Sequence, residues 1–191
     1  MAALDAAFYA AFGNVQASNK RHLLALDVSG SMTWGPVCGT SVLTPRVASA
    51  AMAMVTARTE PQSLFMAFSD SFVPLDIRAD DSLELVMEKM DDLPFSSTDC
   101  SLPMQWALEN QQAIDVFVVY TDNETYAGRM HPSQALQQYR EATGIDAKLI
   151  VVGMTATEFT IADPDDTGMM DVVGFDAGAP EVMSNFAQGL I

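Results

Sequence analysis

A carboxylate and two hydroxyls, those of Asp27, Ser29 and Ser31, stand at alternate positions where an apolar run that begins near residue 22 ends. A buried strand that delivers these groups to its carboxyl end builds a small oxygen-lined concavity, which suits a hard divalent cation. Asp and Ser also cap helices and turn chains routinely, so a purely structural role is the alternative. This short motif alone does not decide between the two interpretations.

Two further segments favour the cation. A second run rich in β-branched and aromatic residues ends on Asp122, and a polar loop before the helical pattern of residues 102–111 carries a hydroxyl at Thr98. The separations from Asp27, about 70 residues to Thr98 and about 95 to Asp122, suit βα units, which bring strand ends together. Three loops would thus supply two Asp, two Ser and one Thr to the same edge of a sheet.

This order of residues resembles the metal-ion-dependent adhesion site of the von Willebrand factor A (vWA) family, in which Asp-x-Ser-x-Ser is followed by a Thr and then an Asp. The resemblance implies that Ser29, Ser31 and Thr98 are direct ligands, while Asp27 and Asp122 hold waters or ligate directly. A small cage rich in hydroxyls favours Mg²⁺, with Mn²⁺ or Ca²⁺ as alternatives.

Three segments narrow this resemblance to the carboxyl-terminal A domain of Ro-type RNA-binding proteins, the TROVE family: residues 98–104, 121–125 and 159–166. Residues 4–12 are similar to the segment that leads into that domain. The resemblance implies a lead-in helix and connector over residues 1–20 and a vWA domain over residues 21–191. In that family RNA binds to an upstream ring of helical repeats, for which this chain of 191 residues leaves no room.

Strands alternate with helices along the chain. Apolar runs predict strands at residues 22–28, 116–120, 148–152 and 172–175, and helical patterns occupy residues 46–58, 81–90, 102–111, 132–143 and 179–190. Residues 64–77 indicate a hairpin whose second strand lies at an edge, because Pro74 cannot donate to a ladder. We therefore predict an α/β fold: a Rossmann-like, doubly wound, mostly parallel central sheet with one antiparallel edge strand and helices on both faces.

Two loops raise questions of their own. Residues 32–45 contain turn-forming Gly and Pro and are expected to lie over the site as a loop. Trp34 in this loop is either an exposed contact or a ring packed against the domain, and we favour the packed ring. The acidic turn at residues 163–168 is either a second cation site or a structural turn, and we favour the turn because it lacks the twelve-residue alternation of calcium loops.

The charge balance argues against nucleic acid as a direct ligand. The chain has 25 acidic and 9 basic residues, a formal charge of −16, and a polyanion would be repelled unless positive charge were gathered on one face. Lys20 and Arg21 form the only adjacent basic pair. We expect no direct nucleic acid binding by this domain alone, and RNA contact only through the upstream region.

The composition also bears on the compartment. No apolar run approaches the roughly 20 residues of a membrane span, and the amino-terminal segment has no secretory signal pattern. Cys38 and Cys100 do not make a disulfide scaffold, so we expect reduced thiols and leave a single bridge open. These features predict a cytoplasmic monomer that does not bind membranes.

The function best supported by these residues is an adhesion-type binding module of a Ro-like ribonucleoprotein, in which an Asp or Glu of a protein ligand completes the shell of a bound Mg²⁺. One alternative is a mainly structural domain that closes the RNA-binding ring, with an idle metal site. Another is a metal-dependent phosphohydrolase that uses Asp27. That chemistry needs a second carboxylate where Ser29 stands, and only Arg129 is expected near the strand ends to hold a phosphate, so we predict that the protein is not an enzyme.

Overall fold

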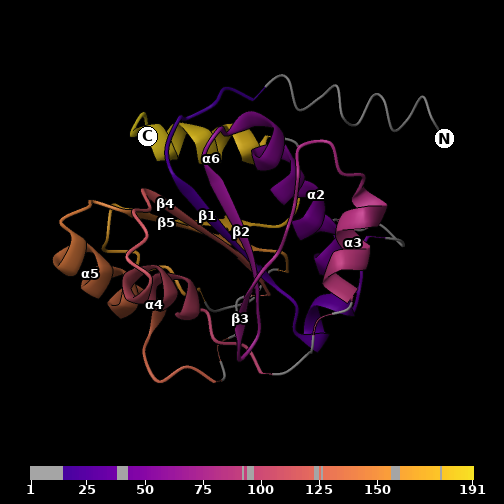
Figure 1. Cartoon of the computed structure of the whole chain (residues 1–191), viewed down its shortest axis with the longest axis horizontal. Coiled ribbons are helices and arrows are strands. Elements are labelled where there is room, and N and C mark those ends of the chain that lie inside the picture. The colour runs from indigo at the N-terminus through magenta and orange to yellow at the C-terminus, as the bar shows by residue number, and fades with distance from the viewer. Residues whose placement is uncertain are drawn as a thin grey trace.

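The computed structural model (Figure 1) describes residues 15–37, 43–91, 93, 97–122, 125, 127–155, 160–176 and 178–191. The predicted lead-in helix and Cys38 lie outside these residues. Within the described ranges, no helix is both long and apolar enough to cross a bilayer.

Among the described residues, six strands form one sheet in the order β3-β2-β1-β4-β5-β6. Their bounds are β1 His22–Asp27, β2 Ser63–Phe68, β3 Phe72–Pro74, β4 Val116–Thr121, β5 Lys148–Gly153 and β6 Met169–Val173. Among these six described strands only the β2–β3 pair is antiparallel, and β3 lies at an edge of the sheet as Pro74 indicated. The predicted mostly parallel sheet with one antiparallel edge strand is confirmed.

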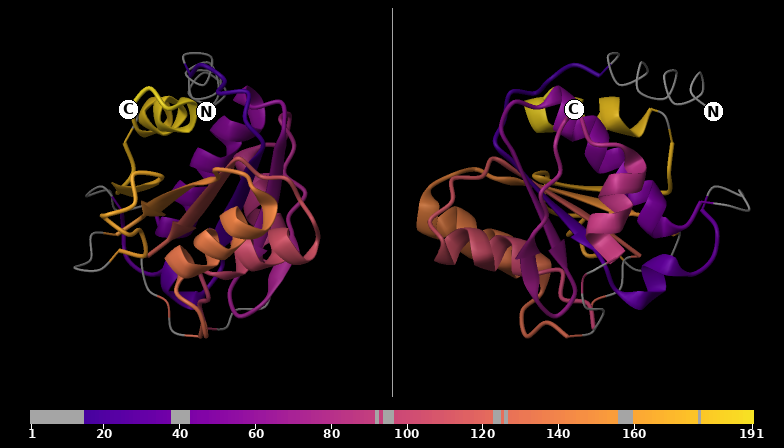
Figure 2. Two further views of the ribbon diagram at one scale, coloured as in Figure 1. Left: turned by 90° about the vertical axis from the view of Figure 1, so that its left-hand side faces the viewer. Right: turned by 45° about the vertical axis from the view of Figure 1, so that its right-hand side comes forward.

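Helices cover both faces of the sheet (Figures 1 and 2). Their bounds are α2 Pro45–Thr59, α3 Leu83–Asp91, α4 Leu102–Glu109, α5 Pro132–Thr143 and α6 Ala179–Gln188. Leu24 and Leu26 of β1 belong to a core shared with α2, α3 and α6, whereas Leu23 and Ala25 pack with α4 and α5. Successive side chains of a strand point to opposite faces, so a central strand covered on both sides is apolar along its middle, as residues 23–26 of β1 are.

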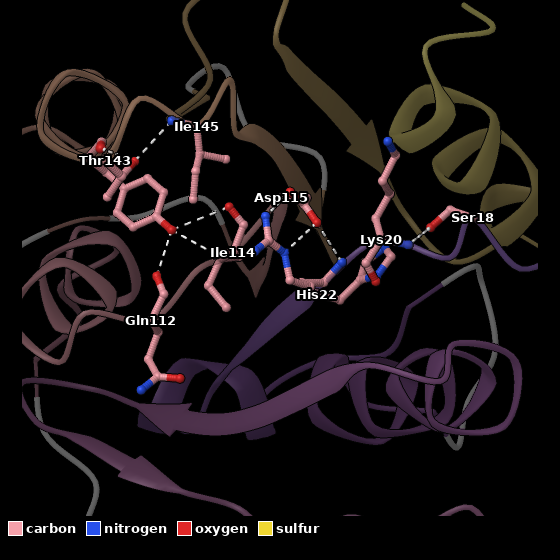
Figure 3. A network of polar contacts seen from close by, with 10 residues as sticks. Ser18, Lys20, His22, Gln112, Ile114, Asp115, Thr143 and Ile145 are labelled. Carbon is pink, nitrogen blue, oxygen red and sulfur yellow. Dashed lines mark hydrogen bonds and ion pairs between the residues drawn. The ribbon is translucent and has the colours of Figure 1, made fainter.

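The amino ends of β1 and β4 are joined by a polar network (Figure 3). Asp115 accepts hydrogen bonds from the backbone N–H of Arg21 at 2.9 Å and from its Nε at 2.8 Å. The hydroxyl of Tyr139 accepts from the Ile114 N–H and donates to the Gln112 carbonyl, both at 2.7 Å. This network fixes α5 and the segment before β4 at the edge opposite the carboxyl ends of the strands.

Most predicted boundaries of helices and strands lie within two residues of those observed, and two differences are more substantial. A short 3₁₀ helix, η2 (Gly30–Thr33), begins inside the motif, where the prediction placed a loop from residue 32. Strand β6 begins at Met169 rather than at residue 172. Beyond Met169, which is buried, Met170 and Val172 are half-buried against the core while Asp171 and Val173 on the other face are exposed, so this edge strand buries one face only. Its weak apolar signal directly after the acidic turn explains why the sequence did not show where it starts.

Candidate metal centre

The five predicted site residues lie at the edge of the sheet where the parallel strands end, Asp27 inside a strand and the others in the segments beyond it. Strands β1 and β4 are neighbours, yet the chain leaves β1 through α2 to β2 on one side and leaves β4 through α5 to β5 on the other. Loops that diverge in this way leave a crevice between them, which is where open α/β sheets bind their ligands. Asp27 is the last residue of β1, and Asp122 follows the last residue of β4.

Asp27 is fully buried and held on both carboxylate oxygens. Its Oδ1 accepts the Ser29 N–H at 2.7 Å, and its Oδ2 accepts the Thr121 hydroxyl at 2.7 Å. Burial raises the pKa of Asp27 to about 6, because desolvation of the charged form outweighs these hydrogen bonds. A cation bound beside Asp27 would offset that desolvation cost.

The two serine hydroxyls lie side by side. The Oγ atoms of Ser29 and Ser31 are 3.1 Å apart, and Met32 is buried beneath the turn that carries them. Adjacent oxygens in an octahedral Mg²⁺ shell, with metal–oxygen distances of about 2.1 Å, are about 3 Å apart. The spacing of the hydroxyl pair therefore suits two neighbouring ligands of one cation.

Thr98 is buried in a loop that is tied to both neighbouring loops. Its carbonyl accepts the Ala127 N–H at 3.0 Å, and the N–H of Asp99 donates to the Ser69 carbonyl at 2.8 Å. Two residues further on, the Sγ of Cys100 lies 3.9 Å from the Thr121 hydroxyl that bonds Asp27. These contacts place the Thr98 loop against the ends of β2 and β4, beside the Asp27 cluster.

Asp122 supplies the observation that bears most directly on a cation. Its side chain is only 7% exposed, and its Oδ1 is buried without a hydrogen-bond partner among the described residues. Buried polar atoms are nearly always satisfied, so such an oxygen is able to take a water or a cation as its partner. Its negative charge also contributes to the raised pKa of Asp27. The donor set of hydroxyls and carboxylates thus fits a hard divalent cation.

Histidine, cysteine and additional carboxylates do not strengthen the case. In the part of the chain that the structure describes, no three His, Cys, Asp or Glu side chains are grouped to hold a metal. A cation at this site would therefore depend on the hydroxyls of Ser29, Ser31 and Thr98 together with Asp27 and Asp122.

Several supporting residues were not predicted. Thr121 bonds Asp27, while Oδ1 of Asp99 accepts from the Ser101 N–H at 3.0 Å and from the Ser101 hydroxyl at 2.5 Å. A Cβ added to Gly128 would lie 2.5 Å from the same Asp99 oxygen, so the loop after β4 approaches the Thr98 loop closely. Thr121 precedes Asp122 at the end of a strand. This position would have predicted a contact with Asp27 only if β1 and β4 were already known to be neighbours.

Arg46 corrects the expectation that only Arg129 brings positive charge near the strand ends. Arg46 is 3% exposed at the start of α2 and donates to the Met90 carbonyl and to Asp91, both at 2.9 Å. Burial lowers the pKa of Arg46, and the charges of Asp91 and Asp27 act in the opposite direction. Because the guanidinium is committed to the end of α3, it is not available to hold a phosphate of a substrate.

Two other groups, the Cys100 thiol and the carboxylates of the acidic turn at residues 163–168, can now be assessed. Burial raises the pKa of Cys100 to about 12, which disfavours the thiolate that a nucleophile requires. In the acidic turn, Oδ2 of Asp166 pairs with Arg140 at 2.5 Å, and Oδ1 of Asp163 accepts the Asp165 N–H at 3.0 Å. Asp163 thus stabilises the turn and Asp166 ties it to α5, in agreement with the structural interpretation.

The favoured prediction for Trp34 was wrong. The side chain is 74% exposed instead of packed against the domain. Its neighbour Met32 is the residue that fills the space beneath the turn, and Gly35 turns the chain away in a left-handed conformation, φ 73°. The apolar position that anchors this loop is thus Met32 and not the larger ring.

Nearly the whole chain is similar in sequence to known proteins. A family model of the Ro60 vWA domain matches residues 21–187. The chain is 57% identical over 187 residues to an RNA-binding protein RO60 of Deinococcus radiodurans, covering 98% of this chain and 35% of that protein. It is 45% identical over 190 residues to an RNA-binding protein RO60 of Caenorhabditis elegans, covering 99% of this chain and 29% of that protein. The chain thus spans about a third of the length of these relatives, which are named for RNA binding and not for a catalysed reaction.

Solved structures of other proteins share the fold of this chain. The crystal structure of the Deinococcus radiodurans Ro protein superimposes with a TM-score of 0.91 and 56% identity, covering 99% of this chain and 38% of that one. A mussel byssus protein, proximal thread matrix protein 1 with a zinc-occupied MIDAS motif, matches with a TM-score of 0.53 at 15% identity, covering 92% of this chain and 46% of that one. The second likeness shows the fold alone.

Proposed function

Because this chain belongs to the Ro60 vWA domain family, we propose that its five site residues bind a divalent cation and, through it, a carboxylate of a protein partner. The observation that carries the proposal is the buried Oδ1 of Asp122, which has no hydrogen-bond partner among the described residues, together with the hydroxyl pair of Ser29 and Ser31. In a binding site these groups gain from a ligand that the protein alone does not supply.

The choice of ligands explains why a partner would be needed. Three of the five residues offer neutral hydroxyls, so they hold a cation without cancelling its charge. Asp27 is already engaged by Ser29 and Thr121, which suits it to orient a ligand or a water. A bound Mg²⁺ supplies an electrophilic position that an Asp or Glu of a partner is able to occupy. The residues of this chain set the position and leave the last ligand to the partner.

Two comparisons support the proposal without testing it. The mussel protein with a zinc-occupied MIDAS shares this fold, so a vWA sheet is able to carry a cation at such a motif. The relatives named RNA-binding protein RO60 are about three times as long as this chain, so we propose that the domain acts within a Ro-like ribonucleoprotein and that RNA contacts lie elsewhere in such a protein.

Calorimetric titration with Mg²⁺ tests the cation site. Thr98→Ala and Ser29→Ala should weaken Mg²⁺ binding by about tenfold or more, since each removes an oxygen of the cage. Thr143→Ala is the matched control, because this threonine hydroxyl bonds the Tyr139 carbonyl inside α5, away from the site. Binding that is unchanged in Thr98→Ala and Ser29→Ala would contradict the site and favour a capping and turn role for the motif.

A second titration in acetate tests the partner carboxylate. Acetate should strengthen Mg²⁺ binding to the unmodified protein, because each ligand completes the other's site. If Mg²⁺ binds through these residues and acetate has no effect, the site is filled but closed to partners. That outcome would support the alternative of a mainly structural domain with an idle metal site.

A further inference from the structure

Trp34 is the most exposed large apolar side chain among the described residues, with 74% of its surface open to solvent. It lies three residues after Ser31, and its backbone N–H donates to the Ser31 carbonyl at 2.9 Å. A proposed cation ligand and a large exposed ring are therefore joined by one turn of backbone.

The turn that carries the ring is held in place. Met32 is buried beneath it, and the hydroxyl of Thr33 donates to the Gly30 carbonyl at 2.7 Å. A ring presented on a fixed turn loses little backbone freedom on binding, which favours a role as a contact for a partner. The exposed surface of a single ring is too small for a purely apolar interface.

Acidic residues stand at the ends of three neighbouring strands at this edge of the sheet. Asp70, which is exposed, follows β2, whereas Asp27 at the end of β1 and Asp122 after β4 are buried at the proposed cation site. The whole chain carries a formal charge of −16. A partner approaching this face is therefore favoured when it is basic overall, apart from the carboxylate that reaches the cation.

We infer that Trp34 binds an Arg or Lys side chain of the partner, next to the partner carboxylate that occupies the cation site. The partner would be a protein segment in which one Asp or Glu is flanked by basic residues. The face of an indole ring attracts guanidinium and ammonium groups more strongly than any other aromatic side chain does. This inference rests on the proposed function, because the carboxylate places the basic side chain beside the ring.

Two peptides in a double-mutant cycle test the inference. Each peptide is short, acetylated and amidated with one central Glu, and the flanking residues are Arg in one and Ser in the other. The ratio of their affinities is measured in Mg²⁺ for the unmodified protein and for Trp34→Ala. The preference for the Arg peptide should fall by about two- to fivefold in Trp34→Ala, the range of an exposed cation–π contact. The general attraction between the net charge of −16 and the Arg residues is common to both proteins and cancels in the cycle.

Three comparisons make the result specific. Trp34→Phe should keep part of the preference, since a phenyl ring is a weaker partner for cations. Leu190→Ala, which removes another exposed apolar side chain, should keep all of it. A preference that is the same in Trp34→Ala and in the unmodified protein would overturn the inference. If neither peptide requires Mg²⁺ to bind the unmodified protein, the proposed function itself fails.

Discussion

Asp27 should make the cation-free protein less stable near neutral pH. Its pKa is raised from 3.8 in the unfolded chain to about 6 by burial, so the folded state binds the proton more tightly. The contribution of Asp27 to the free energy of unfolding therefore falls as pH rises from about 4 to about 6, by up to about 3 kcal/mol, and then stays level. Asp27→Asn should show no such fall. Urea unfolding of both proteins in EDTA, from pH 4 to pH 8, measures the difference.

Asp115 provides a control of opposite sign for that measurement. Hydrogen bonds from Arg21 lower the pKa of Asp115, so its stabilising effect is present above the ordinary range of a carboxyl and is lost as pH falls. Asp115→Asn should thus be less stable than the unmodified protein at pH 7, and this deficit should shrink toward pH 3. A deficit that stays constant with pH would mean that the charge of Asp115 contributes nothing to stability.

The residues of the site divide into those that a pattern reveals and those that only proximity reveals. Asp27, Ser29 and Ser31 are close in the sequence, so their joint position at a strand end could be predicted. Thr121 bonds Asp27 across 94 positions of the chain, and nothing in the sequence pairs them. The residue-scale prediction covered the proposed ligands and missed the groups that hold them.

At the scale of elements, alanine should be damaging at one glycine near the site and tolerated at another. A Cβ at Gly128 would meet Asp99 Oδ1 at 2.5 Å, and two hydrogen bonds from Ser101 hold that oxygen in place. Gly128→Ala should therefore shift the Thr98 loop, weaken Mg²⁺ binding by about tenfold and lower stability by about 1–3 kcal/mol.

Gly30→Ala is the matched control, although Gly30 stands between two proposed ligands. No heavy atom lies within 4 Å of a Cβ built on Gly30. Mg²⁺ affinity by calorimetry and thermal unfolding should both stay close to those of the unmodified protein. If Gly30→Ala is the more damaging of the two, the contact between the loops after β4 and before α4 is not what positions Thr98.

The elements were predictable where one physical rule governs them. Pro74 identified the edge strand because a missing N–H excludes it from the middle of a sheet. The start of β6 was missed since its alternation is that of an edge strand with one buried face, and the exposure of Trp34 was missed because Met32, two residues earlier, fills the space below the loop. Which of two neighbouring apolar residues enters the core depends on the turn, and the sequence does not show the turn.

At the scale of the whole molecule, the charge of this chain argues against direct RNA binding, although its longer relatives are named for RNA binding. Of the 9 basic residues, Arg21, Arg46, Arg78, Lys89 and Arg140 form ion pairs with Asp side chains. Of the adjacent basic residues 20 and 21, Arg21 is thus already paired with Asp115. A phosphate backbone needs several basic side chains on one face, and at least five of nine are already neutralised here.

Lowering the salt concentration should therefore not bring RNA onto this chain. A protein that neutralises several phosphates gains affinity by a factor of about 10³ or more when salt falls from about 200 to 50 mM, because counterions are released. With a charge of −16 and paired basic residues, the field of this chain repels RNA more strongly as screening falls. Fluorescence anisotropy of a labelled single-stranded RNA across that range measures the slope. A steep rise in affinity at low salt would mean that this domain has a basic face and binds RNA itself. If the anisotropy stays low and independent of salt, with and without Mg²⁺, the result is consistent with a cation site that binds a protein carboxylate and not RNA.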